Sequence, residues 1–175
     1  MLTDLQLATT FLISASSAPF IDYSYEFNIC KIYFVGLYIL IDTLRIVCDF
    51  NFLYNPYFYH HVTTLGIVHK VLDTKQCVHL CNPPMFLESS AFVCILSRKY
   101  NAYKWLSKVY WLFDRLVRFP LSMLMNKTCA QYFFVELSVL VFLSSYWSFE
   151  MLQIRNRIPI SLGYACCFSL AYVFS

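Results

Sequence analysis

The sequence predicts an all-α fold, specifically a polytopic transmembrane helical bundle of five to seven spans. Its 175 residues are 59% hydrophobic and 13% charged, with a mean hydropathy of +0.57. A soluble domain carries about 45–50% apolar and about 25% charged residues, so this chain has too few charged residues to cover a water-facing surface. Several apolar runs also approach the roughly 20 residues that a helix needs to cross a bilayer. We therefore expect an integral, multi-pass membrane protein.

The apolar runs define the individual spans, because short polar segments separate them. Five spans are predicted at 32–48, 57–72, 78–97, 104–125 and 132–152. A weaker candidate precedes them at 5–20, and the apolar tail at 158–175 is long enough for one more crossing. The predicted organisation is a short or truncated first helix with its loop at 1–29, a transmembrane domain at 30–155, and an apolar tail at 156–175.

Two consecutive prolines, Pro83 and Pro84, lie inside the predicted 78–97 span. Proline has no backbone donor, so the pair predicts a kink or break at that point. A helix bent there would present Glu88 about one turn later and could form the wall of a cavity. A simple bend without a pocket is the alternative.

Ionisable side chains lie well inside four consecutive apolar runs. In a bilayer each costs at least ~2.5–3.5 kcal/mol if it has no partner, so these groups should converge in the interior of the bundle. Local pairs are expected for Asp42 with Arg45 and for Asp114 with Arg118, from their i, i+3 and i, i+4 spacing. The residues expected to converge are Asp42, His60, His61, Thr64, Glu88 and Arg115.

Two explanations fit such a convergence. Buried polar pairs can hold a bundle in register and bind nothing. Alternatively, the groups form a polar pocket for a lipid head group or an acyl carbonyl, with His60 or His61 as hydrogen-bond donor or general base. Four such groups on successive helices, including a histidine pair, favour the pocket.

The order of these residues resembles the TLC-domain family of polytopic membrane proteins. The family contains the ceramide synthases, the CLN-type endoplasmic-reticulum proteins and the small TLC-domain-containing proteins. The resemblance covers roughly residues 30–155. It rests on Asp42, the HHVTT motif at 60–64, Glu88-Ser89-Ser90, the segment from Arg115 to Pro120, and Tyr146-Trp147.

The resemblance implies two lipid-related functions. His60, His61 and Thr64 match the HHxxT opening of the ceramide synthase signature, in which the histidines serve acyl transfer from acyl-coenzyme A to a sphingoid amine. The His-Asp…Asp cluster that follows in ceramide synthases is missing here, where the chain reads CVHLCNPPMFLESS. The remaining motifs look more like the small TLC-domain-containing proteins, which are linked to membrane-lipid composition. The resemblance thus implies a divergent member, shortened at its N-terminus.

The leading hypothesis is therefore a protein that binds lipid or regulates membrane-lipid composition through a polar mid-membrane pocket. The alternatives are a ceramide-synthase-like acyltransferase with His60 and His61 as catalytic residues, a small transporter or channel, and a copy that has lost its function. The expected partners are membrane lipid and, for the acyltransferase, acyl-coenzyme A. The expected location is the endoplasmic reticulum or the plasma membrane.

Other classes of function are disfavoured. The chain has no Lys/Arg-rich tract, so nucleic acid is not an expected partner. No cofactor is predicted. Cys77-x-His79-x-Cys81, with His69 nearby, has the residue types of a zinc site, but this spacing fits no common structural zinc site, so no metal is predicted either.

Overall fold

The computed structural model describes residues 24–48, 51–75, 77–78, 82–125 and 131–174. The described residues are almost entirely helical and contain no β-strand, which confirms the all-α class. The predicted helix at 5–20 lies outside the described residues. The α-helices are α2 (Tyr25–Val47), α3 (Pro56–Thr74), α4 (Asn82–Lys99), α5 (Lys104–Phe113), α6 (Phe119–Met125), α8 (Phe134–Met151) and α9 (Arg157–Phe174).

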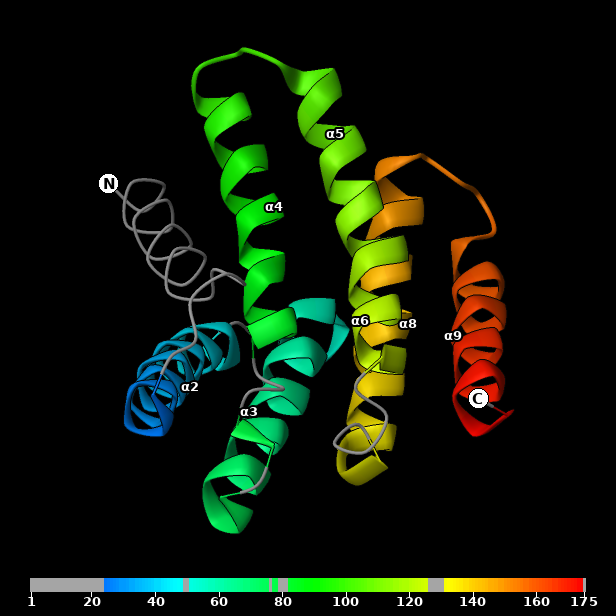
Figure 1. Cartoon of the computed structure of the whole chain (residues 1–175). Helices are drawn as coiled ribbons and strands as arrows, with labels where there is room; N and C mark the ends of the chain where they lie inside the picture. Colours follow the sequence, from blue (N-terminus) through cyan, green and yellow to red (C-terminus); the bar gives the residue numbers. More distant parts are fainter. Residues whose placement is uncertain (1–23, 49–50, 76, 79–81, 126–130, 175) are drawn as a thin grey trace.

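The helices form a bundle in which neighbours along the chain are mostly neighbours in space. In Figure 1, α4, α5 with α6, α8 and α9 run roughly alongside one another, while α3 crosses at an angle and packs against both α2 and α8. Apolar side chains from α2, α3, α8 and α9 fill the core. The most deeply buried of these include Ile32, Val35, Val71, Leu137, Val141 and Phe168.

Helix α3 carries the histidine pair, and local chemistry fixes where it begins. The Asn55 side chain accepts a hydrogen bond from the Tyr57 N–H (3.0 Å), and Pro56 occupies the first helical position, where a missing N–H costs nothing. The helix ends at Lys75, which adopts a left-handed conformation (φ 53°) and donates its N–H to the Val71 carbonyl. His60 and His61 consequently lie in the second turn of α3.

A short π-helical segment, η3 (Asp114–Arg118), joins α5 to α6. The cause is visible in the sequence: Pro120 has no N–H to give to the Leu116 carbonyl four residues earlier, and its ring clashes with that carbonyl. The local turn widens, so that Phe119 donates its N–H to the Asp114 carbonyl five residues back. The Leu116 carbonyl instead accepts a hydrogen bond from the Tyr164 hydroxyl on α9.

The helix boundaries correct the sequence analysis at three points. Helix α2 begins at Tyr25, seven residues before the predicted start at 32, because Ser24 caps it by accepting the Phe27 N–H (3.3 Å). The predicted interior kink at the two prolines was wrong, because α4 begins at Asn82 and the prolines occupy its first turn, where proline is tolerated. The single helix expected over 104–125 contains the π-helical segment.

The length and composition of the described helices support only part of the predicted membrane topology. Within the described residues, two helical segments are long and apolar enough to cross a membrane: Gln131–Met151, which contains α8, and α9. They correspond to the predicted span at 132–152 and to the apolar tail. The sequence predicts five to seven spans, so the remaining spans stay a prediction.

Candidate functional site

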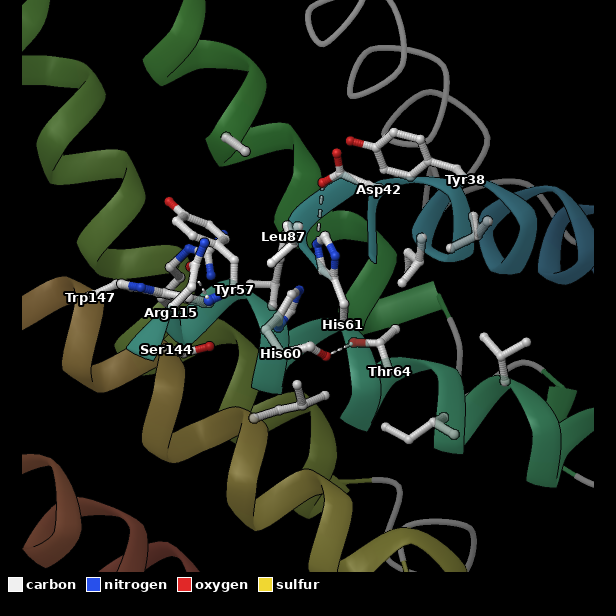
Figure 2. A pocket seen from close by; sticks show the side chains of 18 of the residues that line it. Tyr38, Asp42, Tyr57, His60, His61, Thr64, Leu87, Arg115, Ser144 and Trp147 are labelled. Carbon is white, nitrogen blue, oxygen red and sulfur yellow. Dashed lines mark hydrogen bonds and ion pairs between the residues drawn. The ribbon is translucent and has the colours of Figure 1, made fainter. Parts of the chain in front are cut away.

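A partly open cavity of about 430 Å³ lies between α2, α3, α4, the α5–η3 segment and α8. This volume is within the range of small-molecule pockets, about 300–1,000 Å³. In Figure 2, Asp42 and His61 lie on one side of it, and Arg115 and Trp147 lie on the other, next to Tyr57. The side chain of Glu88 is outside the part of the chain that the structure describes. The predicted site residues that line the cavity are Asp42, His60, His61, Thr64 and Arg115.

On one side of the cavity, a histidine of α3 lies next to an aspartate of α2. The Nε2 atom of His61 lies 3.7 Å from Oδ2 of Asp42, and Oδ1 of Asp42 lies 3.3 Å from Nη2 of Arg45, which confirms the expected i, i+3 pair. His61 is 93% buried, and its Nδ1 atom is buried with no hydrogen-bond partner among the described residues. Asp42 therefore orients the imidazole from one nitrogen while the other remains available to a ligand.

The other side of the cavity is built around Arg115, which lies in η3 and is 95% buried. Its guanidinium carbon is 3.8 Å from the centroid of the Trp111 ring and 5.8 Å from that of the Trp147 ring. Aromatic faces stabilise a desolvated cation by about 2 kcal/mol, and this offsets part of the cost of burying the charge. The Nε1 atom of Trp111 is buried and has no hydrogen-bond partner within the described part of the chain.

The His60 ring connects the two sides. Its centroid is 5.6 Å from that of His61 and 5.4 Å from that of Trp147, with the Trp147 ring nearly perpendicular at 72°. Tyr57, one turn earlier on α3, stacks on Trp147 at 4.8 Å and 25°. This aromatic cluster fixes the imidazole against α8.

Thr64 lies one turn after His60 on α3, but its hydroxyl has only a limited role in binding a ligand. Its hydroxyl donates to the His60 carbonyl of its own helix at 2.8 Å. This backbone hydrogen bond uses the only proton of the hydroxyl, so Thr64 can offer a ligand an acceptor but not a donor.

The cavity lining changes from polar to apolar along three of its helices. On α3, Tyr57, His60, His61 and Thr64 precede Ile67 and Val68. On α2, Arg45 and Asp42 are followed, toward the N-terminus, by Ile39, Tyr38 and Val35, and Ile46 lies next to Arg45 at the polar end. On α8, Trp147 and Ser144 are followed in the same sense by Leu140. Because α3 packs against both α2 and α8, the polar ends of these three stretches face one another, as Figure 2 shows.

Sequence reasoning missed several of the lining residues. Arg98, near the end of α4, lies just beyond the predicted 78–97 span, and neither it nor Trp111 was predicted as a site residue. Trp111 precedes Arg115 by four residues, so their i, i+4 spacing was a usable signal for contact. The expected pair of Asp114 with Arg118 is confirmed as an ion pair, with Asp114 fully buried.

One observation bears on the zinc-site residues Cys77, His79 and Cys81. Cys77 is disulfide-bonded, and a disulfide sulfur is not the thiolate that zinc requires. His79 and Cys81 lie outside the described residues.

No known protein family, no curated protein and no solved structure matches this chain. The resemblance to the TLC-domain family therefore stays a prediction from the motif order.

Proposed function

We propose that this chain is a multi-pass membrane protein that binds a lipid in the cavity, with the head group at the polar end and an acyl chain at the apolar end. The observation that carries the proposal is the change of lining along α2, α3 and α8. A ligand that fits such a lining has a polar and an apolar part, as a membrane lipid does.

The surface of α2 supports placement in a bilayer. Monomeric soluble proteins rarely expose large continuous apolar patches. Helix α2 exposes large apolar side chains over most of its length, while Asp42, on the same helix, lines the cavity. Its 23 residues rise about 34 Å, against a hydrocarbon core about 30 Å thick. The exposed residues include Tyr33, Phe34, Leu37, Leu40, Ile41 and Leu44.

The same arrangement explains how helices with ionisable residues could span a membrane. Such residues are tolerated at membrane depth when they face the bundle interior or a cavity and pair with one another. Asp42 pairs with His61 and Arg45, and Asp114 pairs with Arg118. The proposed spans thus include α2, α3, α4 and the α5–α6 segment in addition to α8 and α9.

The test is the lipid content of the purified full-length chain. Lipids that copurify in mild detergent are extracted and quantified by mass spectrometry for the parent, for His61→Gln and for His69→Gln. His69 is exposed on the same helix and does not line this cavity, so its substitution is a matched control. We expect His61→Gln to lose the copurifying lipid and His69→Gln to keep it. Identical lipid content in all three proteins would contradict the proposal.

The position of Asp42 beside the His61 imidazole favours an acyltransferase as the second candidate. A carboxylate that orients an imidazole is the arrangement used for general-base activation of a nucleophile. In this case purified protein given acyl-coenzyme A and a sphingoid base forms an amide. The product would be lost in His61→Ala and reduced in Asp42→Asn. Absence of product from the parent protein would leave lipid binding as the function.

A further inference from the structure

The charged side chains of the cavity wall are mostly arginines. Arg45 comes from α2, Arg98 from α4 and Arg115 from η3, whereas Asp42 is the one carboxylate among the described lining residues. Asp42 is already engaged by Arg45 and His61. The described lining therefore carries a net positive charge, which favours an anionic ligand and disfavours a cationic one.

A hydrogen-bond donor adds to this charge. The Nε1 atom of Trp111 is buried with no partner among the described residues, and Trp111 lines the cavity. Indole nitrogen is a donor only, so this buried atom indicates a position for an acceptor atom of a ligand. The Nδ1 atom of His61 is also buried without a partner among the described residues; because Nε2 faces Asp42, Nδ1 of the neutral ring offers a ligand an acceptor.

Phosphate oxygens match this set of groups. A guanidinium presents paired N–H donors in a planar fork that fits two phosphate oxygens, and charge-assisted hydrogen bonds of this kind are about twice as strong as neutral ones. We propose that the ligand is a lipid with a net negative phosphate head group, of the kind found in phosphatidic acid. This inference rests on the proposed lipid-binding function and adds the chemical class of the ligand.

The roles of the three arginines differ with their exposure. Arg115 is 95% buried and stacked on Trp111, so it would contact the head group inside the cavity. Arg45 and Arg98 are exposed and line the cavity at its surface, where they would attract the anion and bind its outer oxygens. Their contribution is screened by salt, while that of Arg115 is screened much less.

The tryptophans supply a direct binding assay. Of the three in the chain, Trp111 and Trp147 line the cavity, whereas Trp105 is 75% exposed. Ligand entry should therefore change the intrinsic fluorescence of the full-length chain in neutral detergent micelles. The probes are dioleoyl phosphatidic acid, dioleoyl phosphatidylcholine, dioleoylglycerol and inorganic phosphate. The three lipids have the same acyl chains and differ only in the head group.

The variants separate a role in binding from a role in folding. Arg45→Gln and Arg98→Gln change exposed side chains and should fold. Arg157→Gln, which changes a partly exposed arginine that does not line the cavity, is the matched control. Arg115→Lys keeps the buried charge but loses the planar fork, and circular dichroism checks its fold. We expect phosphatidic acid to bind about tenfold more tightly than the other lipids, and each cavity variant to lose about tenfold of that affinity.

The possible outcomes distinguish this inference from the function on which it rests. Equal affinity for the three lipids would overturn the anionic head group and leave lipid binding in place. Inorganic phosphate binding as tightly as phosphatidic acid would retain an anion site and overturn the lipid. No fluorescence change with any probe would overturn both. A loss of affinity in Arg157→Gln equal to that in Arg45→Gln would also overturn the inference, because it would show attraction to the overall charge of the protein.

Discussion

Removing the Tyr164 hydroxyl should destabilise the chain through a carbonyl on another helix. The Leu116 carbonyl lacks its usual helical donor because Pro120 has no N–H, and Tyr164 supplies the replacement. A fully buried acceptor left unsatisfied costs about 1–3 kcal/mol, and this hydrogen bond is partly buried. Tyr164→Phe should therefore lower the free energy of unfolding by about 1–2 kcal/mol. For a chain of this length it should lower the melting temperature by roughly 2–8 °C.

The assay is a double-mutant cycle in mixed micelles, with unfolding followed by circular dichroism during titration with a denaturing detergent. In the Pro120→Ala background the backbone N–H is restored, so Tyr164→Phe should cost only about 0–0.5 kcal/mol there. Tyr54→Phe, which removes a hydroxyl from a side chain that is 88% exposed, is the control and should have no effect. Equal costs of Tyr164→Phe in the two backgrounds would refute the assignment of this hydrogen bond.

Two further predictions concern helix packing and can be checked by the same unfolding assay. A Cβ atom at Gly36 would lie 3.0 Å from Cγ1 of Val68, whereas one at Gly163 would meet no atom within 4 Å. Gly163→Ala should therefore gain up to about 1 kcal/mol of stability from helix propensity, and Gly36→Ala should gain less or destabilise the chain. Equal gains would show that α2 and α3 are not in close contact there. Lys70 on α3 forms an ion pair with Glu136 on α8, with the lysine half exposed. Lys70→Met should cost less than about 1 kcal/mol, and a larger loss would indicate a pair buried from solvent.

The sequence predicted the helical class and the approximate position of each described helix, because long apolar runs separated by polar segments leave few alternatives. It also named ionisable residues from separate segments that lie on the wall of one cavity. The reasoning used one physical fact, the cost of an unpaired charge in an apolar environment, and it named Asp42, His61 and Arg115 from three different segments. The structure places all three on the wall of one cavity.

Features that depend on tertiary contacts were not predictable in the same way. The π-helical segment follows from Pro120, but its stabilisation depends on the Tyr164 hydroxyl, which is 48 residues from Leu116 in sequence. The position of Pro83 and Pro84 was misjudged because an apolar run does not mark where its helix begins. The contact between Arg115 and Trp147 joins two helices, and nothing in the local pattern of either one indicates it.

A helix can be a proposed membrane span even when its mean hydropathy is low, and the reason is physical. A hydropathy window averages over all faces of a helix, so polar residues on one face lower the average even when the opposite face is apolar. On α2 the polar residues Asp42 and Arg45 line the cavity, while Leu37 and Leu44 are exposed. Asp42 and Arg45 thus lower the mean hydropathy of α2 and at the same time build the site. For a bundle with a polar interior, the distribution of charge between helix faces is a better criterion of membrane insertion than the mean over the helix.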